Sequence, residues 1–101
     1  MAEVRQIRGP LIHSDRLENE ITYQVDPNLP ELNRGPLALT IIPADPTGTL
    51  SGSLLLQHGM MSYTMDLSAG DWYRRLGLLS SFTIAPTGLN PAEKFSIKFL
   101  W

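Results

Sequence analysis

The sequence predicts an all-β protein: an antiparallel β-sandwich or small barrel of six to seven strands, with at most one short helical turn. Three observations support this class. Several segments alternate apolar and polar residues with a period of two, as strands with one buried face do. They recur about every ten residues, between turns rich in proline and glycine. The sequence contains no heptad, internal repeat or low-complexity segment.

We expect residues 1–16 to form an extended N-terminal arm, or an edge strand broken at Gly9-Pro10, because proline lacks an N–H donor. The arm is expected to dock on its own domain or on a neighbouring subunit, since unattached termini fray. The whole chain, 1–101, is a single β domain, because a chain of this length buries roughly two-thirds of its unfolded surface in one core.

The next segments alternate between strands and turns. Residues 17–25 alternate apolar and polar positions and predict a strand. Residues 26–36 contain three prolines, so we expect a long loop, and such loops often form contact surfaces. Residues 37–43 predict a strand that is buried on both faces and ends at Pro43. Residues 44–52 predict a turn.

The hairpin predicted between Ser53 and Ser68 is the segment around which we expect the fold to be organised. Three consecutive leucines, Leu54 to Leu56, predict a first arm that is covered on both faces. Gly59 supplies the positive φ of a tight turn. In the second arm every other residue is apolar, which predicts a half-buried strand (Met61, Tyr63, Met65, Leu67). We interpret Met60, Met61 and Met65 as core-filling side chains.

The last third of the chain predicts two more strands. In residues 69–77, Asp71 could cap a single helical turn that Gly77 ends, and a loop is the alternative. Residues 78–85 predict a strand that ends before Pro86. The clearest alternation is in the final strand, where four large residues face one way (Phe95, Ile97, Phe99, Trp101).

Composition excludes several classes of protein. Eight basic and ten acidic residues give a net charge of −2, without the basic surface that nucleic-acid binding requires. Cysteine is absent, so disulfides and thiol chemistry are excluded. The sequence has neither the apolar core of a signal peptide nor an apolar run of about 18 residues, so we expect no membrane span and a cytoplasmic protein.

The sequence offers no catalytic, cofactor-binding or metal-binding motif, so we predict a protein that is not an enzyme. There is no G-x-S-x-G motif and no glycine-rich phosphate loop. His58 lies beside a turn glycine, and His13-Ser14-Asp15 with this distant histidine matches no metal-ligand spacing. A hydrogen bond from His58 to a serine or a carboxylate inside a pocket would favour an enzyme instead.

Tryptophan, tyrosine and arginine gather at Trp72–Arg75. These residue types dominate protein-binding hot spots, and together they form platforms for anions or carbohydrate. Alternatively, Trp72 plugs the end of the sandwich while Arg74 and Arg75 remain in water. Trp101 continues the inward alternation of its strand and is expected in the core. If it projected beyond its sheet, it would instead anchor a neighbour.

Small, cysteine-free, turn-rich β domains of this kind resemble the accessory virion proteins of tailed bacteriophages, such as capsid decoration or tail proteins. The resemblance extends over the general character of the whole chain. It implies a non-catalytic structural subunit that assembles with copies of itself or with a larger protein lattice, in a virion assembled in the host cytoplasm. The expected partners are the chain itself and other structural proteins.

Under this interpretation, residues 1–16 and 26–36 reach over neighbours. The expected interface residues are Arg5, Arg8, Leu29, Leu32, Arg34, Trp72, Tyr73, Arg74, Arg75 and Trp101. The alternative function is a carbohydrate- or small-ligand-binding β module, with Trp72, Tyr73 and Arg74 as its platform.

Overall fold

The computed structural model of the chain describes residues 3–9, 11–14, 17, 19–28, 35–45, 50–77, 79–89 and 93–101. Within them it has nine strands and one 3-10 turn, η2 (Leu67–Ala69). The strands are β1 (Glu3–Ile7), β2 (Leu11–Ser14), β3 (Ile21–Val25), β4 (Ala38–Pro43), β5 (Ser53–His58), β6 (Met61–Asp66), β7 (Tyr73–Arg75), β8 (Ser81–Thr87) and β9 (Phe95–Leu100). The predicted all-β class is confirmed, with more strands than expected.

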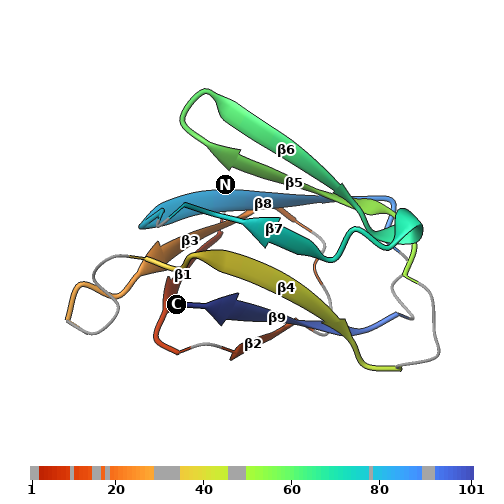
Figure 1. The fold of residues 1–101 in the computed structure, drawn as a ribbon, viewed down its shortest axis with the longest axis horizontal. Helices are drawn as coiled ribbons and strands as arrows, with labels where there is room; N and C mark the ends of the chain where they lie inside the picture. The colour runs from red at the N-terminus through yellow and green to blue at the C-terminus, as the bar shows by residue number, and fades with distance from the viewer. Residues whose placement is uncertain are drawn as a thin grey trace.

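The strands pair as one long antiparallel ribbon that folds back on itself at Gly59–Met60. Outward from this turn, β5 pairs with β6, β4 with β7, β3 with β8, and β2 with β9. The ribbon then rolls up, because β5 also pairs with β8 and β4 also pairs with β9. The result is a jelly roll of two sheets, in the orders β1-β3-β8-β5-β6 and β2-β9-β4-β7 (Figure 1).

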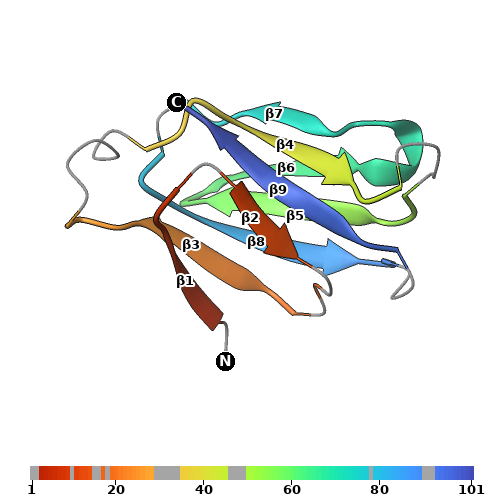
Figure 2. The same cartoon turned by 90° about the horizontal axis from the view of Figure 1, so that it is seen from below.

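The N-terminal segment belongs to both sheets. β1 pairs in parallel with β3 at the edge of the five-stranded sheet, and β2 pairs with β9 at the edge of the other. Figure 2 shows the chain crossing between the layers after β1. The predicted edge strand broken near Gly9-Pro10 is therefore present, and it docks on its own domain. Ile7, at the end of β1, is fully buried.

The core lies between the sheets and is built from alternate residues of facing strands. Three aromatic rings meet at its centre, those of Tyr23, Phe82 and Phe99, with centroids 5.8–5.9 Å apart. The predicted alternation of the last strand is confirmed for three residues, which are at most 6% exposed (Phe95, Ile97, Phe99). This arrangement buries apolar area while the opposite faces of both sheets remain accessible.

The helical turn expected between Asp71 and Gly77 does not form. The 3-10 turn comes earlier, where the Asp66 carboxylate accepts hydrogen bonds from the Ser68 N–H (3.1 Å) and hydroxyl (2.6 Å). Gly70, with φ 80°, ends the turn. Residues 73–75 instead form β7, because their backbone pairs with β4 and satisfies that strand's outer edge.

Other predicted boundaries differ in detail. The strand predicted over 17–25 begins at Ile21. Pro86 lies inside β8 rather than ending it: it is opposite Leu54 of β5, at a position beyond the pairing with β3, which ends at Ile84. β4 ends at Pro43 as predicted, but Ile42 is 40% exposed, so the strand is not buried on both faces.

Candidate functional site

A cleft of about 660 Å³ opens between the two sheets, where the edge strands β6 and β7 face one another. β7 and the segment that follows it form one wall, and the β5–β6 hairpin forms the other (Figure 1). The volume is within the usual range for small-molecule sites. Its lining residues are Leu56, His58, Met61, Tyr63, Tyr73, Arg74, Arg75, Leu76, Gly77 and Leu79.

The inner face of the hairpin emerges from the core step by step. Leu54 and Met65, which are opposite one another, are at most 1% exposed. The next inward pair is Leu56 and Tyr63, and the tyrosine is already half-buried. At the following pair, His58 and Met61, both side chains are exposed. The hairpin therefore supplies a wall that is apolar and only partly covered.

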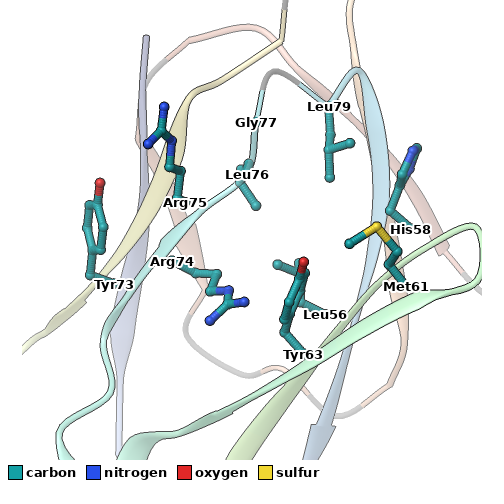
Figure 3. Close-up of a pocket in the computed structure, with 10 residues that line it drawn as sticks. All are labelled: Leu56, His58, Met61, Tyr63, Tyr73, Arg74, Arg75, Leu76, Gly77 and Leu79. Carbon is teal, nitrogen blue, oxygen red and sulfur yellow. The ribbon is translucent and has the colours of Figure 1, made fainter.

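Arg74 contributes the charge of the cleft. It pairs with the buried Leu39, so its side chain projects from the face of β7 that is turned toward the core. Its Cζ lies 3.6 Å from the centre of the Tyr63 ring, and Figure 3 shows the two groups facing each other. The ion pairs among the described residues are Arg5–Glu3 and Arg8–Asp26, so Arg74 has no carboxylate partner there.

His58 has a main-chain partner. Its Nδ1 lies 2.8 Å from the Ser81 carbonyl oxygen, and a carbonyl can only accept, so Nδ1 carries the proton and donates. The partner is thus neither the serine hydroxyl nor the carboxylate that an activated nucleophile would require. No group of three or more potential metal ligands occurs in the described part of the chain.

The Trp72–Arg75 cluster does not form one patch, because successive strand residues point to opposite faces. The Trp72 indole N–H donates to the Leu67 carbonyl (2.9 Å) and the ring packs against the core, as the plug interpretation predicted. Tyr73 and Arg75 are exposed and lie across β7 from Arg74 (Figure 3). The expected platform of Trp72, Tyr73 and Arg74 is therefore wrong.

The prediction that Trp101 lies in the core is also wrong. Trp101 follows the end of β9, is 38% exposed, and contacts Phe99 edge to face at 6.3 Å. It lies one residue beyond the pairing of β9 with β4, which ends at Leu100. Leu37, just before β4, lies beside the end of β9, because its N–H donates to the Leu100 carbonyl (2.7 Å). Its side chain is 40% exposed, so it adds a second accessible apolar residue there.

The remaining predicted interface residues divide into two groups. Arg5 and Arg8 are on the surface near β1 and pair with Glu3 (3.0 Å) and Asp26 (3.2 Å) respectively. The hydrogen bond to Glu3 is the main cause that raises the pKa of Arg5. Leu29, Leu32 and Arg34 lie outside the described residues.

Two methionines at the hairpin turn were misassigned from the sequence. Met65 is buried as expected, but Met60 is fully exposed and Met61 is 58% exposed. The glycine turn signalled that Met60 would lie at the tip of a hairpin, where no opposing strand can cover it. Exposure of Met61 had no comparable sequence signal, because it continues the buried alternation of β6.

Comparison with known proteins gives no match: no family model, curated protein or solved structure is significantly similar to this chain. Within the described ranges, the only helical element is the three-residue η2, so none of the helices there has the length or apolarity to cross a membrane.

Proposed function

We propose that this chain is a non-catalytic structural subunit that assembles with copies of itself or with a larger protein lattice, as a component of a phage virion. The observation that carries the proposal is the exposure of large apolar side chains at one end of the sandwich. Four such residues, from 38% to fully exposed, belong to segments at that end (Leu37, Met60, Met61, Trp101).

These residues come from three segments that the fold brings to the same end. The β5–β6 turn, the start of β4 and the end of β9 lie at the same end of the long axis in both views, the turn at the top of Figure 1 and the C-terminus lower down (Figures 1 and 2). Methionine and tryptophan are enriched in protein interfaces, and burying their surface in a partner is favourable. We name Leu37, Met60, Met61 and Trp101 the apolar end.

The fold supports the proposal by analogy. Jelly rolls are common in viral capsid proteins, and this agrees with the resemblance to accessory virion proteins. A fold hosts many functions, so the analogy adds weight only alongside the apolar end. The same topology also occurs in lectins, but the platform expected for carbohydrate is divided between the two faces of β7.

Sedimentation velocity of the purified chain tests self-assembly. We expect species heavier than the 11.2 kDa monomer at tens of micromolar protein. The double variant Met60→Ser, Trp101→Ser should shift the distribution toward monomer. The matched control is Val4→Ser, which removes an apolar side chain of 57% exposure on β1, at the opposite edge of the same sheet as β6.

The virion component is tested separately, by probing virus-sized particles from the producing cells with an antibody against the chain. We expect the chain to co-sediment with those particles. A protein that remains monomeric at every concentration and is absent from the particles would refute the proposal.

A further inference from the structure

We infer that the cleft between β6 and β7 binds a small organic carboxylate with an apolar body, through the guanidinium of Arg74. This inference goes beyond the proposed assembly role and does not depend on it. It rests on the cleft between the sheets, whose described lining shares only Met61 with the apolar end.

The walls of the cleft select an apolar ligand body. Leu56, Leu76 and Leu79 line it together with the ring of Tyr63 and the side chain of Met61. Figure 3 shows the leucines and Tyr63 around one space, with Arg74 at its side. Withdrawing the aliphatic surface of a ligand from water in such a site favours binding.

The single inward charge selects an anion. Among the described residues that line the cleft there is no aspartate, glutamate, asparagine or glutamine, so no carboxylate or amide side chain there pairs with Arg74. The Arg74 Cζ lies 3.6 Å from the centre of the Tyr63 ring, a cation–π contact that holds the guanidinium beside this wall of the cleft. The N–H donors of a guanidinium lie at the edges of its own plane. A carboxylate can accept two of these N–H bonds side by side, which is the strongest arrangement for this pair.

The same lining disfavours carbohydrate. Sugars present many hydroxyls, and a site for them needs acceptors and donors at several positions. Here the described side-chain polar groups that line the cleft are limited to His58, two tyrosines and two arginines, and Tyr73 and Arg75 point away from it. One cation beside aliphatic walls matches a molecule with one charged end.

A structural role for Arg74 provides the competing explanation. Inward-pointing charges on edge strands prevent unwanted pairing with other sheets, and β7 is an edge strand. That role requires no ligand. It predicts that replacing Arg74 promotes aggregation. It also predicts that wild type and variant either bind carboxylates equally well or do not bind them at all.

Isothermal titration calorimetry with octanoate distinguishes these explanations. We expect saturable binding at one site per chain, with a Kd of about 1 mM or below. Arg74→Gln should weaken binding about tenfold or more, because it removes a charge-assisted pair. Arg75→Gln is the matched control, since it removes the same charge from the next residue, on the other face of β7, and should leave Kd within about twofold.

Two further probes complete the experiment. Octanamide has the same chain without the charge and should bind at least about tenfold more weakly than octanoate. Leu79→Trp should reduce octanoate binding by filling the cleft, and circular dichroism melting checks that each variant is folded. Saturable octanoate binding that depends on Arg74 but not on Arg75 supports the inference.

Each of the other outcomes overturns it. These are no saturable binding of octanoate, equal affinity for octanoate and octanamide, and equal losses in the Arg74 and Arg75 variants. Binding of an acidic peptide without binding of octanoate would also overturn the assignment to a small molecule. None of these results bears on sedimentation of the wild-type chain, so the assembly proposal is judged independently.

Discussion

The hydroxyl of Tyr23 is buried without a hydrogen-bond partner among the described residues, and the side chain is 0% exposed. Leaving a buried polar group unpaired costs about 1–3 kcal/mol. The ring itself is well placed, 5.8 Å from Phe82 and 5.9 Å from Phe99. Tyr23→Phe removes the hydroxyl and retains both ring contacts, so we expect the variant to be more stable than the wild type.

The expected gain is about 1 kcal/mol, because the removed oxygen leaves a small space and loses some packing. For a domain of this size, that free energy corresponds to a rise in Tm of about 4–8 °C. Urea denaturation followed by circular dichroism measures it. Tyr73→Phe is the control, since its side chain is 56% exposed and the change should stay within about 0.5 kcal/mol.

The pH dependence provides a second measurement. Burial raises the pKa of Tyr23 above its ordinary value of 10.0, although the charge of the nearby Arg5 opposes the shift. The folded state therefore retains the proton to higher pH than the unfolded state, and stability falls as pH rises above about 10. Tyr23→Phe lacks this loss, so its advantage over the wild type should widen from pH 9 to pH 11, values chosen to bracket the ordinary pKa.

A loss of 1 kcal/mol or more in Tyr23→Phe at pH 7 would refute this reasoning, because it would mean that the hydroxyl makes a stabilising hydrogen bond. An unchanged difference between wild type and variant across pH 10 would refute the pKa argument separately.

Two further predictions concern turns, both measured by urea denaturation. Gly52→Ala should lower the free energy of unfolding by about 2 kcal/mol or more, because the new Cβ would lie 2.5 Å from the Thr87 carbonyl oxygen. Gly70 has a similar positive φ but open space around it, so Gly70→Ala should lower it by only about 1 kcal/mol. Equal losses in the two variants would contradict the close approach at Gly52. Asp66→Ala should lower the free energy of unfolding by about 1 kcal/mol, because the cap of η2 is lost, and Asp71→Ala should change it by no more than about 0.5 kcal/mol. A larger loss for Asp71→Ala than for Asp66→Ala would contradict the assignment of Asp66 as the cap.

The sequence was most informative where strands are long and covered on one face. The alternation around Phe82, Ile84 and Ile97 predicted buried positions correctly, and Gly59 marked the central turn. β7 was missed because three residues are too few to show a period. That miss also led to the wrong grouping of Trp72–Arg75, since a strand there would have implied opposite faces.

The cleft could not be predicted from local pattern. Tyr63 and Met61 continue the same alternation as the buried Met65. Nothing in the residues themselves indicates at which position along β6 the side chains stop being buried by the opposite sheet. Their surroundings are set by β7 and the segment after it, which belong to the other sheet and do not pair with β6. Arg74 gives no sequence signal of facing inward, because its direction follows from pairing with Leu39.

The nested pairing of the strands also has a consequence for how the chain folds. Among the strand pairs described, only β5 and β6 are consecutive in the chain and joined by a short turn. Each later pair of the ribbon encloses the earlier ones, until Leu11 meets Lys98 near opposite ends of the sequence. If the inner hairpin forms first, the next pair closes over much shorter gaps, which lowers the entropic cost of each step. We therefore expect folding to zip outward from Gly59, on the millisecond-to-second scale typical of proteins rich in long-range β pairing (roughly 10⁻³–1 s).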